Sequence, residues 1–127
     1  LDEAFRGSDI PQAIFSPDGH WVGTVQITWD GPYKLNIYDT VTQQLDMSMS
    51  IGEDNIPLIS LAFNPTGSLV AVGRVNGEIL LIDVNQRAVV ATLRGHQGAV
   101  EHLVFSTDGH YLISGSNDGT IRTWGLP

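Results

Sequence analysis

The sequence predicts an all-β fold: an open segment of a β-propeller, with about three four-stranded antiparallel blades that form an incomplete ring. The first observation is a repeat, because a Phe followed by a Gly-containing turn recurs at Phe15, Phe63 and Phe105, which are 48 and 42 residues apart. The second is that short apolar runs separated by turn residues follow each copy, without a segment of helical periodicity. Repeats of about 40–45 residues that hold four short strands are typical of propeller blades.

The last third of the chain shows the repeating unit most clearly. Three short runs, at residues 99–105, 111–116 and 120–124, are expected to be strands. Turns at Asp108-Gly109 and Asp118-Gly119 separate them. An Asp-Gly pair between two apolar runs is a strong hairpin signal, because Gly adopts the positive φ that tight turns need. This stretch is therefore predicted to be a three-stranded meander.

The two earlier copies have the same pattern and add a fourth run. Repeat 1 predicts strands at 11–15, 20–27, 34–39 and 44–50, and repeat 2 predicts strands at 58–63, 69–74, 78–84 and 88–93. Repeat 1 carries about four extra residues between its second and third strands, since Gly19 to Asp39 spans 20 residues and Gly67 to Asp83 spans 16. We therefore divide the chain into a tail strand of a preceding blade (1–7), a first blade (8–51), a second blade (52–94) and a third blade without its last strand (95–127).

Two strands of repeat 2, at residues 69–72 and 79–82, are apolar on both faces. A strand of this kind is expected to be buried on both faces, and in a propeller the two neighbouring blades cover these faces. Propellers typically have 4–8 blades, so three blades leave apolar faces that need a cover. One hypothesis is that the chain is the C-terminal part of a longer propeller, whose remaining blades supply this cover. The other is self-assembly, in which two chains contribute six blades.

The composition excludes several classes of partner. The chain has 14 acidic and 6 basic residues and a net charge of −8, so a nucleic-acid partner is not expected. No run approaches the ~18–20 apolar residues of a membrane span, and the opening Leu1-Asp2-Glu3 does not resemble a signal peptide. Cysteine is absent, which fits a reducing compartment, and a cytoplasmic location is expected.

A group of polar residues in repeat 3 resembles a known family. Gly95-His96, Ser114, Asp118 and Trp124 are similar to the repeat motif of the WD-repeat β-propeller family. The final Trp-Asp pair of that motif is altered in each copy: it reads Tyr38-Asp39, Ile82-Asp83 and Trp124-Gly125. The resemblance covers nearly the whole chain and is strongest in repeat 3.

The resemblance implies a structural role for four side chains. In the family, residues at the positions of Trp124, Ser114, His96 and Asp118 form a tetrad that ties the strands of one blade together. The expected order is from the Trp124 indole N–H, which can only donate, to Ser114, then His96, then Asp118. A satisfied buried network of this kind fixes the strand register.

Catalytic and metal-binding alternatives have weaker support. His96, Ser114 and Asp118 have the residue types of a hydrolytic triad, but Ser114 is predicted within a buried strand and not on the exposed turn that a nucleophile needs. His20, His96, His102 and His110 do not have the spacing of zinc ligands. The glycines mark hairpins and do not form a phosphate-binding loop. We therefore expect no enzyme activity, no metal and no cofactor.

The remaining candidates for function are surface loops. In the resembling family, loops at one end of the blades bind peptides and proteins, and the matching residues here are Trp29, Asp30, Tyr33, Arg74, Gln97 and Asn117. Exposed Trp and Tyr side chains commonly anchor interfaces, although Trp29 can equally fold back over the blade edge. The predicted function is a non-catalytic scaffold for protein or peptide partners. The alternative is a regulatory propeller attached to a catalytic domain outside this chain.

Overall fold

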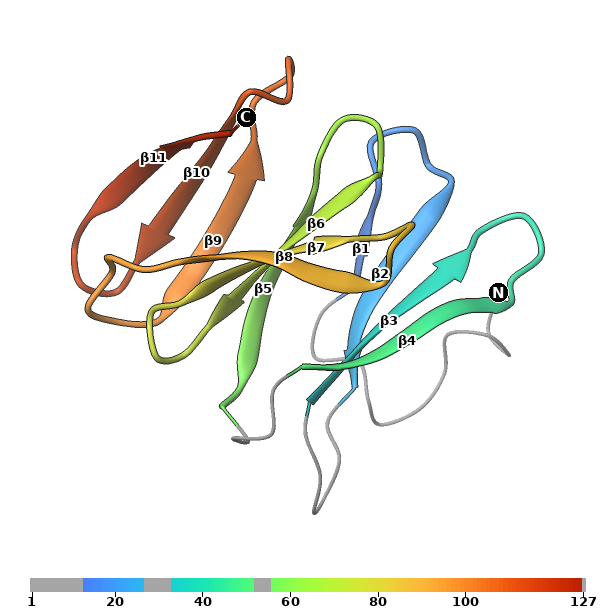
Figure 1. The fold of residues 1–127 in the computed structure, drawn as a ribbon, viewed down its shortest axis with the longest axis horizontal. Coiled ribbons are helices and arrows are strands. Elements are labelled where there is room, and N and C mark those ends of the chain that lie inside the picture. Colours follow the sequence, from blue (N-terminus) through green and yellow to red (C-terminus); the bar gives the residue numbers. More distant parts are fainter. Residues whose placement is uncertain (1–12, 27–32, 52–55, 127) are drawn as a thin grey trace.

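The computed structural model describes residues 13–26, 33–51 and 56–126, and in these residues it contains eleven β-strands and no helix (Figure 1). The strands are β1 (Ala13–Phe15), β2 (Trp21–Gln26), β3 (Tyr33–Asp39), β4 (Leu45–Ile51), β5 (Leu58–Phe63), β6 (Leu69–Arg74), β7 (Ile79–Asp83), β8 (Ala88–Leu93), β9 (Val100–Phe105), β10 (Tyr111–Ser116) and β11 (Ile121–Gly125). None of the described segments is a helix long and apolar enough to span a bilayer.

The strands form three antiparallel sheets, in the orders β1-β2-β3-β4, β5-β6-β7-β8 and β9-β10-β11. The three sheets follow one another in space in the same order as in the sequence, so the second sheet lies between the first and the third (Figure 1). They do not close on each other, which confirms the predicted open, all-β propeller segment. The predicted tail strand at 1–7 lies outside the described residues, and the boundaries of the predicted division stay a prediction.

The turn after the first strand of each sheet contains a Gly at the same place, and in the first and third sheets an Asp precedes it. Gly19, Gly67 and Gly109 all have positive φ, between +75° and +77°. In the third sheet the Ser106 hydroxyl donates to Asp108 Oδ1 at 2.6 Å, and the His110 N–H donates to the same oxygen at 2.9 Å. The Asp side chain thus holds the turn that the following Gly makes possible.

The first buried cluster lies between the first two sheets. It contains Leu35 and Ile37 from the first sheet and Phe63, Val70 and Ile82 from the second. The Phe63 ring packs against Gly23, where an added Cβ would be 3.3 Å from Phe63 Cε2. A Gly in β2 therefore makes room for the ring of the next sheet.

The second buried cluster lies between the second and third sheets. It contains Ala71 and Leu81 from the second sheet and Val100, Phe105 and Leu112 from the third. With a cluster on each side, β6 and β7 are buried over almost their whole length. This agrees with the burial on both faces that their continuous apolar sequences predict.

Candidate functional site

Three connections between strands lie at the same end of the second and third sheets, the end where β5 begins with Leu58. Leu58 at the start of β5 pairs with Arg74 at the end of β6. Ile79 at the start of β7 pairs with Leu93 at the end of β8. On its other side Ile79 pairs with Gly73 near the end of β6. The connections at residues 75–78, 94–99 and 117–120 therefore lie at this end. We call them the loop face.

Backbone hydrogen bonds connect neighbouring loops of this face. The Val75 N–H donates to the Pro57 carbonyl at 3.0 Å, and the Asn117 N–H donates to the Ala99 carbonyl at 3.1 Å. Gly77 has a φ of +95°, and a Cβ at this position would overlap the His96 carbonyl oxygen. The loops are therefore held against each other by main-chain contacts, which limits their freedom.

The structure brings the four tetrad residues together in one hydrogen-bonded chain. The Trp124 Nε1–H donates to Ser114 Oγ at 2.9 Å, and Ser114 Oγ lies 2.7 Å from His96 Nε2. His96 Nδ1 lies 3.1 Å from Asp118 Oδ2. Because Ser114 Oγ accepts from the indole, its own hydroxyl is free to donate to His96 Nε2, and His96 Nδ1–H then donates to the carboxylate.

Each member of the tetrad comes from a different element. His96 lies in the loop between β8 and β9, Ser114 in β10, Trp124 in β11 and Asp118 in the turn between these last two strands. The chain of bonds therefore ties a loop of this face to β10, the central strand of the third sheet, and to β11 at its edge. Ser114 has no exposed surface, and both of its neighbours engage its hydroxyl, so it is not placed to attack an external substrate.

Asp118 also shapes the loop face directly. Its Oδ1 accepts from the Thr120 hydroxyl at 2.6 Å and from the Thr120 N–H at 2.8 Å, and its Oδ2 accepts from the Gln97 N–H at 2.9 Å. These donors, with the Thr120 hydroxyl first, hold the pKa of the Asp118 carboxyl well below its ordinary range. Asp118 thus fixes the backbone of Gln97, whose side chain is exposed, beside the exposed Asn117.

The lowered pKa of Asp118 predicts how its contribution to stability depends on pH. A carboxyl whose pKa is lower in the folded state stabilises the fold above its unfolded pKa, and this contribution is lost as the pH falls below about 4. The urea midpoint of Asp118→Asn is therefore expected to lie below that of the parent chain, with the largest difference at neutral pH. Urea titrations over a range of pH check this. A difference that stays constant down to about pH 3 would show that the charge of Asp118 does not contribute.

A polar pocket of about 240 Å³ lies on the loop face. Its lining residues are Asn76, Gly77, Glu78, Arg94, Gly95 and His96. Glu78 is central, since its Oε1 accepts from Arg74 Nη1 at 3.0 Å and its Oε2 accepts from Arg94 Nε at 3.1 Å. The two cations differ in exposure, because only 5% of the Arg74 side chain is exposed, against 72% of that of Arg94.

The residues predicted to contact a partner are thus placed differently from one another. Gln97 and Asn117 are exposed on the loop face, whereas Arg74 is buried beneath it and supports Glu78. Tyr33 is half-buried and packs against the cluster between the first two sheets. Trp29 and Asp30 lie outside the described residues.

Sequence reasoning did not identify Arg94 or Glu78 as candidates. Arg94 directly precedes Gly95-His96, so its position next to the motif was the signal available for it. Glu78 follows the Asn76-Gly77 turn, whose position in the repeat places it on the same end of the sheets. The ion pairs themselves join residues that are 4 and 16 positions apart, and nothing in the repeat pattern predicts them.

Comparisons with known proteins agree with this architecture. The profile of the family described as "WD domain, G-beta repeat" matches residues 87–125. The chain is 34% identical over 125 residues to "Ribosome biogenesis protein YTM1" of Phaeosphaeria nodorum, covering 95% of this chain and 25% of that protein. It is 35% identical over 126 residues to "WD repeat-containing protein 36" of Homo sapiens, covering 99% of this chain and 13% of that protein. It is 29% identical over 113 residues to "WD repeat-containing protein 91" of Bos taurus, covering 89% and 15%. The chain thus spans a quarter or less of the length of these relatives.

Proposed function

The chain belongs to the WD-repeat family of β-propellers, and on that basis we propose that it is a non-catalytic scaffold whose loop face binds protein or peptide partners. Proteins of this family act as protein-interaction scaffolds. Only one of these relatives has a name that states a process, ribosome biogenesis, so the proposal extends to partner binding and not to one pathway. A cytoplasmic location is part of the proposal and rests on the absence of cysteine.

The observation behind this proposal is that the tetrad holds the backbone of Gln97, whose side chain is exposed. His96 and Ser114 are buried, and Asp118 connects them to the backbone of Gln97. A side chain on a loop held in this way loses little conformational freedom on binding, which favours affinity. The tetrad therefore has a role for recognition that does not require any of its members to touch the partner.

The pocket beside the tetrad contributes the polar chemistry. Arg94 has its Nε paired with Glu78 while most of its side chain is exposed, so the rest of its guanidinium can donate to a partner. Together with Gln97 and Asn117, this makes a surface rich in hydrogen-bond donors and acceptors. Such a surface suits the backbone and polar side chains of a peptide segment.

A paired set of substitutions tests the proposal. Gln97→Ala with Asn117→Ala is expected to lower partner retention by about tenfold or more, because it removes central polar contacts, and to leave the melting temperature within about 2 °C. The matched control is Gln86→Ala with Asn85→Ala, two exposed residues at the turn before β8, away from the loop face. Retention is measured by affinity capture with the full chain from an extract of the source organism, with quantification of each captured protein. If both double variants captured equally less partner, or if both captured as much as the parent chain, the loop face would not have a binding role.

The same assay extends to the predicted contacts outside the described residues. Trp29→Ala and Asp30→Ala are expected to weaken capture of the same proteins as the Gln97 and Asn117 pair. Unchanged capture in both would remove residues 29 and 30 from the proposed binding surface and leave the rest of it in place.

A further inference from the structure

The turns after the first strand of each sheet gather at the end of the sheets opposite the loop face, since β5 begins at the loop face and runs toward them. A Cβ on Gly109 would lie 3.6 Å from Pro65 Cδ, so the third turn contacts the second. A Cβ on Gly67 would lie 3.7 Å from Ser16 Cβ, so the second turn contacts the first. We call these three turns, residues 16–20, 64–68 and 106–110, the turn face.

An apolar pocket of about 260 Å³ lies between these turns. Four of its six lining residues are Pro or Phe, and they come from all three sheets: Pro17, Phe63, Pro65, Phe105, Ser106 and Thr107. Phe63 and Phe105 are buried, whereas Pro17 and Thr107 are exposed and form the rim. Pockets that hold whole small molecules usually measure about 300–1,000 Å³, so this one has room for a single large side chain.

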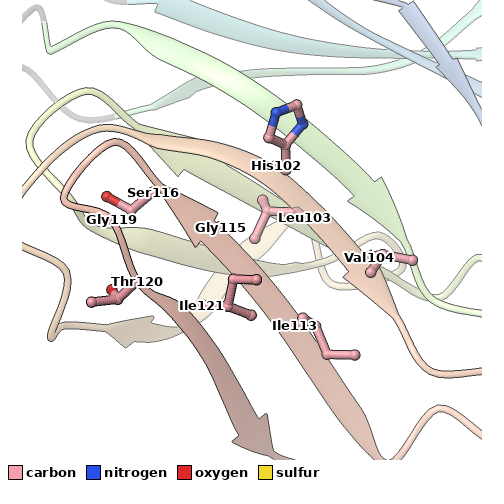
Figure 2. Close-up of a pocket in the computed structure, with 9 residues that line it drawn as sticks. All are labelled: His102, Leu103, Val104, Ile113, Gly115, Ser116, Gly119, Thr120 and Ile121. Carbon is pink, nitrogen blue, oxygen red and sulfur yellow. The ribbon is translucent and has the colours of Figure 1, made fainter.

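Figure 2 shows a larger hollow, of about 490 Å³, on the outer side of the third sheet, and its lining includes His102, Val104, Ile113 and Ile121. In the second sheet the residues 42 positions before Ile113 and Ile121 have no exposed surface, because the third sheet packs on them. The larger hollow therefore belongs to the packing of successive sheets. The pocket of the turn face differs, since it lies where the described sheets already meet.

Two carboxylates lie beside the pocket of the turn face. Asp18 directly follows Pro17, Asp108 directly follows Thr107, and both Asp residues are exposed. The hydroxyl of the Ser two residues earlier donates to Oδ1 of each Asp at 2.6 Å. This bond is the main reason why the pKa of both carboxyls is lower than their ordinary value, so both are ionised at neutral pH.

The rest of this end of the sheets is also acidic. β3 and β7 end here with Asp39 and Asp83. Among the described residues of this end, Arg87 is the only Lys or Arg, and its Nη2 donates to the Asp46 carbonyl at 3.3 Å. The field of these carboxylates attracts a basic partner and repels an acidic one.

We propose that the pocket of the turn face binds one large apolar side chain of a partner peptide, whose flanking Lys or Arg residues pair with Asp18 and Asp108. Burial against the Pro and Phe rings supplies the affinity, and the carboxylates select the charge of the flanking residues. The site lies at the opposite end of the sheets from Gln97 and Asn117. It therefore does not rest on the proposed function.

Three fluorescein-labelled peptides test the proposal on the full chain by fluorescence anisotropy. The first has one Leu between two pairs of Lys, the second has Gly in place of Leu, and the third has Glu in place of each Lys. The first is expected to bind about tenfold or more tightly than the second, because the pocket buries the Leu side chain. The third is expected not to bind.

The comparison among the peptides decides the proposal by itself. Equal affinity of the Leu and Gly peptides would overturn it, since binding would then come from attraction to the acidic surface alone. Binding of the Glu peptide, or no binding of the Leu peptide, would overturn it as well.

A pair of substitutions in the chain places the peptide. Thr107→Lys puts a charge at the rim of the pocket and is expected to weaken binding of the Leu peptide by about tenfold or more. The matched control is Thr66→Lys, which adds the same charge at an exposed residue of the neighbouring turn that does not line the pocket. It is expected to change the affinity by about threefold or less, because solvent screens exposed charges. Equal weakening in the two variants would overturn the proposal.

The chain with Gln97→Ala and Asn117→Ala separates this site from the loop face. It is expected to bind the Leu peptide as the parent chain does, even if it captures less of the loop-face partners. Loss of Leu peptide binding in this double variant would place the peptide on the loop face and overturn the proposal.

Discussion

Ser114→Ala is expected to lower the free energy of unfolding by about 2–4 kcal/mol, because it removes the shared partner of two polar groups at once. The Trp124 Nε1–H and His96 Nε2 both use Ser114 Oγ, at 2.9 and 2.7 Å, and Ser114 is fully buried. Alanine has nearly the same size, so the effect reports the lost hydrogen bonds and not a cavity. Urea denaturation followed by far-UV circular dichroism measures it.

The control for this change is Ser50→Ala, which removes an exposed hydroxyl from β4 and is expected to change stability by about 0.5 kcal/mol or less. His96→Ala is expected to cost roughly 1–3 kcal/mol, since it leaves Ser114 and Asp118 without their common partner. If the urea midpoint of Ser114→Ala equalled that of the parent chain, the tetrad would not be a stabilising network.

Gly73→Ala is expected to destabilise the chain by about 1–3 kcal/mol, because the added methyl group has no room between the second and third sheets. A Cβ on Gly73 would overlap the Ser60 hydroxyl and lie 2.8 Å from the Val100 carbonyl oxygen. These two atoms form the hydrogen bond that joins the sheets, at 2.8 Å. The substitution must therefore separate β9 from β5 or break this bond. Urea denaturation measures the loss of stability.

The chain contains its own control for that prediction. Gly115 occupies the equivalent place in β10, 42 residues later, and a Cβ there meets only His102 Cβ, at 3.7 Å. Gly115→Ala is expected to be neutral or to stabilise by up to about 1 kcal/mol, since Ala loses less backbone entropy than Gly. Equal destabilisation in the two variants would show that the cost comes from the strand position and not from the contact between sheets.

Both predictions describe a molecule in which each sheet is stabilised by its neighbours. The first two sheets share one buried cluster, and the second and third share another. Repeat architectures of this kind gain stability from each contact between adjacent units. For recognition, the consequence is that neighbouring loops, such as those of Gly77 and His96, keep fixed positions relative to one another.

The elements of the fold were largely predictable from the sequence. The repeat of Phe15, Phe63 and Phe105 sets the spacing of the units, and the Gly-containing turns set the ends of the strands. The predicted strand at 69–74 matches β6, and the one at 88–93 matches β8. These features are local, because short apolar runs and the positive φ of turn glycines depend on neighbours in the chain. The tetrad residues could be named because their positions match the repeat motif of the WD-repeat family.

The roles of individual side chains depended on which sheet lies beside them. Phe15 and Phe63 have the same place in the repeat, yet one is 63% exposed and the other 5%. Arg74 was expected at the surface, and the structure buries it under Glu78, where Arg94 is the exposed cation. By itself, then, the sequence determined the period, the strands and the motif, since these follow from hydrogen bonding and turn geometry between close neighbours. Only the tertiary structure decided burial and ion pairing. Burial arises from packing between units about 40 residues apart, and the ion pairs depend on how Arg74, Glu78 and Arg94 meet at one end of the second sheet, neither of which the repeat pattern of a single unit encodes.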